Sequence, residues 1–235
     1  MNKFNLSGDL RSFLFGACRI ILYALATILL AEFIRWDGLR SPIDNRFSEG
    51  SPTEILQSVF LFISSLLLLR LYATSTTYKY TSILLFGLTG ASLVREQDIY
   101  FENYIAQSSW QIPAYVILGF ALFQAIKNHR AFLKEMKSYL NSLSFGLFSA
   151  GLITTYVFSR LFGRKIFWHA VMENHYIRAV KNAAEECLEL YGYLFIFISI
   201  IELFVLSKRK PVQQMLFNTK RQHLRDPIML ENHVN

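Results

Sequence analysis

The sequence predicts an all-α, polytopic transmembrane helix bundle of about six spans, with an amphipathic extracytoplasmic helix before the last span. Of its 235 residues, 53% are hydrophobic, and the apolar residues gather in long blocks. The mean hydropathy is only +0.30, so polar segments must separate these blocks. The basic residues gather in alternate connections between the blocks, which is the pattern of a protein that crosses a membrane several times.

Six apolar blocks each fit a helix across about 30 Å of hydrocarbon, which needs roughly 20 residues. They cover residues 12–34, 55–73, 81–94, 112–126, 143–162 and 188–206. The first block could be mistaken for a signal peptide, but its apolar run continues to Phe33, which is long for a signal core. Residues 1–207 are therefore predicted to form one bundle. Residues 208–235 are predicted to form a basic cytoplasmic tail.

The charged residues orient the six spans. An even number of spans places both termini on one side, and a cytoplasmic placement puts more than half of the 24 Lys and Arg there. Most of the 17 Asp and Glu then fall on the outer side. This predicts a multi-pass protein of a bacterial-type inner (plasma) membrane. The formal charge of +7 suits anionic lipids, and a nucleic-acid partner is not expected because no binding motif accompanies it.

Two outer segments differ in pattern. Residues 36–54 hold two Gly and two Pro and are predicted to form an irregular loop, after which Ser51 and Glu54 cap the second span. Between Trp168 and Tyr191, apolar residues recur every three or four positions, which predicts an amphipathic helix. This helix either lies along the membrane interface and turns inward or runs continuously into the sixth span.

The stretch "LVREQDIYFENY" places four charges where the third span ends. On a helix, Arg95, Asp98 and Glu102 share one face, so Arg95 could pair with Asp98 while Glu102 stays available. Glu96 points about 100° away. The simpler interpretation is a polar collar at the membrane edge. The alternative is a set of carboxylates that face the bundle interior, in which Asp98 and Glu102 are candidate catalytic residues and Arg95 and Glu96 bind a ligand.

The stretch "AAEECLEL" places three carboxylates at the start of the sixth span. Glu185 and Glu189 lie four residues apart on one helical face, and Glu186 is three residues from Glu189. Like charges at this spacing repel, so the group needs a cation, either a basic side chain or a metal ion. Glu189 is a candidate catalytic residue, and Glu185 and Glu186 are candidate binding residues. A solvated helix start is the plainer interpretation.

The third candidate set is the pair His169 and Glu173. The two residues are four positions apart, so both side chains can ligate one metal ion from a single helical face. The spacing permits a divalent metal but is not diagnostic of one. Known intramembrane hydrolase motifs are incomplete: Ser159-Arg160 precedes His169 by more residues than the Ser-Arg-x5-His element of lipid phosphatases allows. No family can be named from these residues.

Two functions remain open. The first is a non-transporting inner-membrane protein that presents an acidic site on its outer side to lipid, to a membrane protein partner or to a second copy of itself. The second is an intramembrane hydrolase or transferase acting on a lipid-like substrate, in which the carboxylates and His169 hold a divalent metal or activate water. Transport is less favoured, because the spans carry no charge at mid-membrane.

Overall fold

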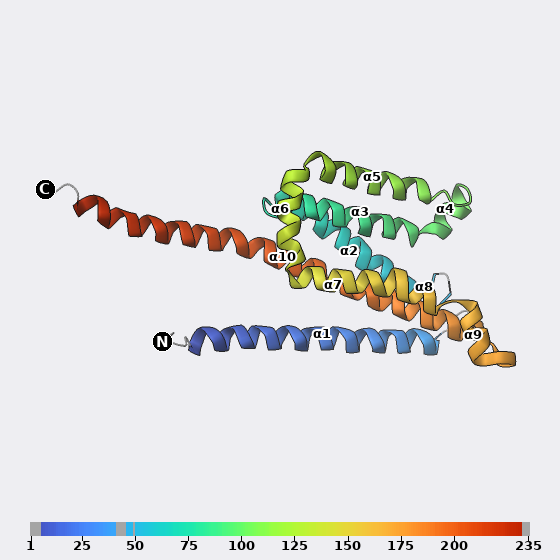
Figure 1. Cartoon of the computed structure of the whole chain (residues 1–235). Helices are drawn as coiled ribbons and strands as arrows, with labels where there is room; N and C mark the ends of the chain where they lie inside the picture. The colour runs from blue at the N-terminus through green and yellow to red at the C-terminus, as the bar shows by residue number, and fades with distance from the viewer. Residues whose placement is uncertain (1–5, 41–45, 49, 232–235) are drawn as a thin grey trace. The chain divides into compact units, whose positions relative to one another are not determined.

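In the computed structural model of the chain the described residues form helices joined by turns, and there is no strand among them (Figure 1). It describes the backbone of residues 6–40, 46–48 and 50–231, and the side chains of these residues except 6–9, 12 and 209–231. Four helices are long and apolar enough to cross a membrane, namely Phe13–Arg40, Pro52–Thr74, Leu143–Phe162 and Arg178–Lys208. The predicted all-α class is therefore confirmed, with four candidate spans.

The helices follow one another with short connections. In chain order they are α1 (Leu6–Arg40), α2 (Pro52–Thr74), α3 (Lys79–Arg95), α4 (Asp98–Tyr104), α5 (Gln111–Lys127), α6 (His129–Leu140), α7 (Leu143–Leu152), a π-helical segment (Ile153–Phe158), α8 (Ser159–Phe162), α9 (Lys165–Met172), a 3₁₀ turn (Glu173–His175) and α10 (Arg178–Glu231).

The third and fourth predicted spans lie in α3 and α5, which have 17 residues each. At 1.5 Å per residue such a helix is about 26 Å long, slightly less than the roughly 30 Å of hydrocarbon. These two helices therefore fall below the length expected of a span. The predicted count of six is not confirmed by helix length and composition.

The segment predicted as an outer loop is partly helical. The prediction was wrong for residues 36–40, because α1 continues to Arg40. Residues 41–45 and 49 lie outside the described residues. The predicted start of α2 is confirmed, since Pro52 opens the helix and Ser51 Oγ accepts from the Glu54 backbone N–H at 3.4 Å. Proline is tolerated there because the first N–H groups of a helix have no partner within it.

The predicted amphipathic helix is interrupted. The sequence offers no Pro or Gly break between Trp168 and Tyr191, yet α9 ends at Met172 and α10 begins at Arg178. Glu173 has a φ of +49°, a left-handed conformation that cannot continue an α-helix. The last span was predicted to end at residue 206, and the backbone of α10 continues beyond it to Glu231. The basic residues after Leu206 end the apolar segment and not the helix.

The backbone contacts divide the chain into two compact units. Unit 1 comprises Met1–Leu56 and Thr154–Tyr191, and unit 2 comprises Gln57–Ile153 and Gly192–Asn235. In unit 2, α3 packs along α5, where a Cβ built on Gly87 would lie 2.5 Å from the Ala121 Cβ. Small residues thus let these two helices approach closely, as is common in membranes.

Unit 2 is also held by hydroxyl hydrogen bonds and ring contacts between helices. Ser65 of α2 donates to Thr89 Oγ1 of α3 at 3.2 Å, and Ser144 of α7 donates to the Ser199 carbonyl of α10 at 2.7 Å. The rings of Phe60 and Phe197 stack at 5.2 Å. Short hydroxyls can bond across helices without water, so they suit the interior of an apolar bundle.

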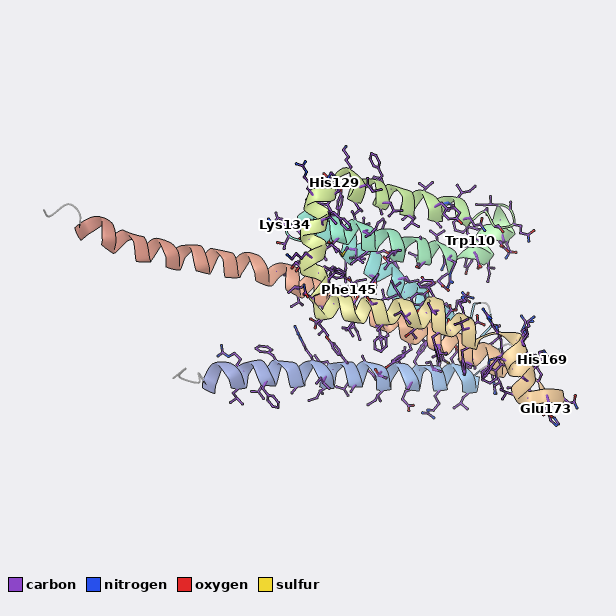
Figure 2. All side chains as sticks on the ribbon, viewed as in Figure 1. Trp110, His129, Lys134, Phe145, His169 and Glu173 are labelled. Carbon is purple, nitrogen blue, oxygen red and sulfur yellow. The ribbon has the colours of Figure 1, made fainter. Side chains whose placement is uncertain are left out.

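Two ends of unit 2 differ in charge. The short helix α6 crosses one end, where Figure 2 labels His129 and Lys134, and Trp110 lies at the other end. The α6 end carries most of the basic residues of unit 2, namely Arg70, Lys79, Lys127, Arg130, Lys134, Lys137 and Lys208. The other end carries Arg95 with Glu96, Asp98 and Glu102. The orientation of these two ends across a membrane stays a prediction.

Candidate functional site

Four of the predicted site residues, Arg95, Glu96, Glu185 and Glu189, lie in two polar clusters, one in each unit. The Arg95 cluster, in unit 2, consists of Arg95, Glu96 and Tyr193. The Arg160 cluster, in unit 1, consists of Ser159, Arg160, Lys181, Glu185 and Glu189. Each cluster joins residues that are far apart in the sequence.

The Arg95 cluster is a closed triangle of polar groups. Glu96 Oε1 accepts from Arg95 Nη2 at 2.5 Å and from the Tyr193 hydroxyl at 2.7 Å. Arg95 Nη2 also lies 3.3 Å from the Tyr193 oxygen, to which it donates. The Glu96 side chain is 8% exposed and Tyr193 is fully buried. A carboxylate this buried needs a cation and hydrogen-bond donors, and both are supplied from within the chain.

The end of α3 explains why Arg95 pairs with Glu96. The Glu96 and Gln97 N–H groups donate to the Ser92 and Val94 carbonyls, which tightens the last turn and closes the helix. The helical face expected to carry Arg95 together with Asp98 therefore ends at Arg95. The expected Arg95–Asp98 pair is replaced by Arg95–Glu96 for this reason. Gln97 turns back and donates to Ser58 Oγ of α2 at 2.7 Å.

Helix α4 holds the other two carboxylates of this stretch. Asp98 Oδ1 accepts from the backbone N–H of Ile99 at 2.8 Å and opens the helix. Glu102 is exposed, and its Oε1 accepts from the Ser108 N–H at 3.3 Å. Ser108 has a φ of +61°, so this bond closes a tight turn after α4. No residue of α4 is buried, and Tyr100 and Tyr104 are 62% and 83% exposed.

The Arg160 cluster is an ion-pair network. Arg160 lies 3.2 Å from Glu185 Oε1 and 3.2 Å from Glu189 Oε1, through its two terminal nitrogens. Lys181 pairs with the second oxygen of Glu185. The expected need of Glu185 and Glu189 for a cation is thus met by basic side chains. Glu186, the third acid of the stretch, is half-buried on the same helix and also takes part in interactions.

The π-helical segment positions Ser159 beside this network. A π turn holds one more residue than an α turn, and such turns often accompany functional sites. Ser159 is fully buried, and its hydroxyl lies 2.6 Å from the Thr155 carbonyl and 3.2 Å from Glu189 Oε1. A Cβ built on Gly163 would lie 2.7 Å from the carboxyl carbon of Glu185. A side chain larger than that of glycine at this position would require the Glu185 side chain to shift.

His169 and Glu173 are not held on one helical face. α9 ends at Met172, so Glu173 belongs to the turn that follows, as Figure 2 shows. The His169 ring stacks on Tyr176 with centroids 3.9 Å apart. In the part of the chain that the structure describes, no group of three or more His, Cys, Asp or Glu side chains is arranged to hold a metal ion.

Chemically, the two clusters resemble neutralised polar anchors more than open reaction centres. Each buried carboxylate bonds to a basic side chain, and the Ser159 hydroxyl is enclosed. The sequence did not identify Tyr193 as a partner of Glu96 or Arg160 as a partner of Glu185. These contacts join residues 97 and 25 positions apart, and no local sequence pattern marks such a contact.

Asp37 was also not singled out. It is 1% exposed, and its Oδ2 accepts from the Thr53 N–H at 3.1 Å and from the Thr53 hydroxyl at 2.5 Å. This carboxylate therefore caps the start of α2 from the end of α1, where a negative charge also meets the positive end of the helix dipole. Its position directly after Trp36 gave the only local signal, that of an acid at the end of an apolar run.

A comparison of the chain with protein-family models, with curated proteins and with solved structures found no match.

Proposed function

We propose that this chain is a six-span protein of a bacterial plasma membrane, with both termini in the cytoplasm, that interacts at its extracytoplasmic end with membrane lipid or a membrane protein partner. In this proposal α3 and α5 join the four longer candidate helices as spans. In this proposal the outer acidic site binds a lipid or a protein, and transport of a solute is less favoured. Its α4 helix presents the interacting surface, and the Arg95 cluster holds the base of that surface in place.

Exposed apolar side chains support the membrane location. Along α5 the outward positions are almost all large and apolar, and they are 43–70% exposed. These residues are Ile112, Tyr115, Val116, Phe120, Leu122, Phe123 and Ile126. A water-soluble protein rarely exposes so large a continuous apolar patch, whereas lipid requires one. The basic α6 end of unit 2 supports a cytoplasmic placement of that end.

The exposure of α4 is the observation that carries the proposed interaction. The carboxylates of the Arg95 and Arg160 clusters are bonded to basic side chains, but Asp98 and Glu102 lie on a helix with no buried residue. Beside them, Tyr100, Tyr104 and Ile105 are 62–83% exposed. Aromatic side chains next to charges are typical of the membrane interface. Carboxylates at that depth attract the ammonium of a zwitterionic lipid headgroup or the basic residues of a partner.

Site-specific photo-crosslinking in cells tests this interaction. A photo-crosslinking amino acid at Tyr104 is expected to give a discrete adduct with lipid or with one protein, including a second copy of the chain. The matched control places the same group at Tyr115, which is 69% exposed on α5 and reports general lipid contact. The Asp98→Asn/Glu102→Gln variant is expected to weaken the Tyr104 adduct alone. The proposal is contradicted if Tyr104 gives the same adducts as Tyr115 and if the Asp98→Asn/Glu102→Gln variant does not change them.

Reporter fusions test the orientation separately. A fusion after Asn235 is expected to be active only as a cytoplasmic reporter, and a fusion within residues 36–54 only as an extracytoplasmic one. An extracytoplasmic C-terminus would reverse the placement of α4 and of both clusters.

The alternative function, a hydrolase, predicts a bound metal ion. It requires a divalent metal or an activated water at the carboxylates, so mild purification would retain a stoichiometric metal that Asp98→Ala or Glu189→Ala releases. We expect no such metal, because Arg160 and Lys181 already neutralise Glu185 and Glu189. A stoichiometric metal lost in either variant would favour the enzyme over the proposed binding protein.

A further inference from the structure

A pocket lies in unit 2 where α2 ends. Its volume is about 330 Å³, and its walls come from the last turn of α2, the connection to α3 and the last apolar turn of α10. The side chains that matter for its chemistry are those of Arg70, Thr74, Ser75, Thr76, Phe204 and Lys208. All belong to the basic end of unit 2, opposite the Arg95 cluster.

Two cations meet at one ring in this pocket. The Arg70 guanidinium carbon lies 5.7 Å from the centroid of Phe204, and the Lys208 ammonium lies 4.4 Å from the same centroid. A cation over an aromatic face gains modest stabilisation at an exposed site. The shared ring therefore holds two like charges at one place, although they repel each other. Among the described residues that line the pocket there is no carboxylate to offset them.

Hydroxyl groups complete the lining. Ser75 Oγ accepts from the backbone N–H groups of Thr77 and Tyr78, each at 3.2 Å, so its own hydrogen is directed elsewhere and can be donated to a ligand. Thr76, next to it, is exposed at the pocket. Thr74 donates to the Arg70 carbonyl at 2.7 Å and fixes the last turn of α2 below the guanidinium.

We infer that this pocket binds a phosphate group. A guanidinium, an ammonium and a serine hydroxyl around one small space are the donors that a phosphate oxygen accepts, and arginine can bind two of its oxygens at once. The ligand also supplies the negative charge that the two cations lack. Arg70 stands four residues before the end of α2, and Lys208 ends the apolar part of α10. Both positions match the depth of a lipid headgroup in the proposed membrane orientation.

The phosphate can come from an anionic phospholipid or from inorganic phosphate in the cytoplasm. The inference rests on the membrane location in the proposed function but not on the interaction at α4. Its test uses the purified full-length protein, so a failure at α4 and a failure here are distinguishable.

Native mass spectrometry of the detergent-solubilised protein tests the site. Phosphatidylglycerol, phosphatidylcholine and inorganic phosphate are titrated in separate series. The wild-type chain is expected to bind one phosphatidylglycerol more tightly than phosphatidylcholine. In Arg70→Gln/Lys208→Gln this affinity is expected to fall about 25-fold, since each basic residue near a lipid phosphate contributes about fivefold.

Three variants separate a built site from general positive charge. Arg70→Lys keeps the positive charge but loses the bidentate hydrogen bonding of arginine. The affinity of this variant for phosphatidylglycerol is therefore also expected to fall. Lys79→Gln and Lys127→Gln remove cations that also lie over aromatic rings, those of Tyr72 and Phe123, but do not line the pocket. Both controls are expected to bind as the wild type does.

The outcomes are distinct. Preference for phosphatidylglycerol, lost in the Arg70 variants and kept in both controls, supports a lipid phosphate. Binding of inorganic phosphate with the same variant pattern, without preference between the lipids, supports the site with free phosphate as its ligand. Equal affinity of the wild type and the double variant for every probe overturns the inference. An equal loss in the two control variants also overturns it, because the effect is then one of net charge.

Discussion

The Tyr193 hydroxyl donates to Glu96 Oε1 at 2.7 Å and joins α10 to the end of α3 across 97 residues of sequence. The bond stabilises a carboxylate that is 8% exposed and that shares its oxygen with Arg95. Tyr193 itself is fully buried. The Arg95 cluster is therefore a fixed contact between two helices of unit 2, and its members are expected to respond strongly to small changes.

Replacing Tyr193 with Phe tests this contact with little change in shape. The variant removes one donor from a buried charged acceptor, which is expected to lower the free energy of unfolding by about 1–3 kcal/mol. Titration with SDS in mixed micelles measures this quantity. Tyr104→Phe, at an 83% exposed position, is the matched control and is expected to unfold as the wild type does. Equal stability of Tyr193→Phe and the control would show that the hydroxyl bond contributes nothing.

Removing Arg95 is expected to cost more. Arg95→Leu leaves the Glu96 carboxylate buried without its cation, and breaking a buried pair typically costs about 3–5 kcal/mol. Adding Glu96→Gln to this variant removes the uncompensated charge, so the double variant is expected to recover part of the loss. A double-mutant cycle in mixed micelles measures the coupling. If the two losses simply add, Arg95 and Glu96 do not interact.

Gly151 gives a test of close helix packing in unit 2. A Cβ at this position would lie 2.7 Å from the Gly192 carbonyl oxygen and 2.7 Å from Ile196 Cγ1. Gly151→Ala is therefore expected to push α7 from α10 and to lower the free energy of unfolding by about 1–3 kcal/mol. Gly146→Ala is the matched control on the same helix, where a Cβ meets nothing within 4 Å. Because alanine forms helices more readily than glycine, this control is expected to be at least as stable as the wild type. A loss of stability in the control equal to that of Gly151→Ala would contradict the assignment of the effect to the Gly192 and Ile196 contacts.

The helices were largely predictable from the sequence, whereas the contacts between them were not. Blocks of apolar residues mark helices in any membrane bundle, and Ser51 with Glu54 marked the start of α2 correctly. The pairing of Arg95 was misjudged because the expected face required a continuous helix, and α3 ends at that residue.

The candidate site depended on contacts of high sequence separation. Arg160 follows a π turn and meets Glu185 near Gly163, and neither the π turn nor this close approach has a local sequence pattern. The break at Glu173 was missed for a related reason: a non-glycine residue with positive φ leaves no signature in hydrophobic periodicity. Periodicity reports which face is apolar, and it does not report where the backbone turns.

Glu135 of α6 predicts a pH dependence of stability. The side chain is 8% exposed, and its Oε2 accepts from the Thr81 backbone N–H at 2.8 Å at the start of α3. Burial raises the pKa of the Glu135 carboxyl above its usual value of 4.5, and the Thr81 N–H offsets part of this rise. The folded chain therefore holds the proton at a pH where the unfolded chain has released it.

The difference in bound protons sets how the free energy of unfolding changes with pH. Above pH 4.5 and up to the raised pKa, the unfolded state binds fewer protons than the folded state, so the free energy of unfolding falls as the pH rises through this window. Glu135→Gln stays neutral and keeps an oxygen that can accept from Thr81, so it is expected to lose this slope and to be more stable than the wild type at neutral pH. Unfolding in mixed micelles at a series of pH values measures the difference. Glu102→Gln removes an exposed carboxylate and is expected to keep the slope, whereas an unchanged slope in Glu135→Gln would assign the dependence to another group.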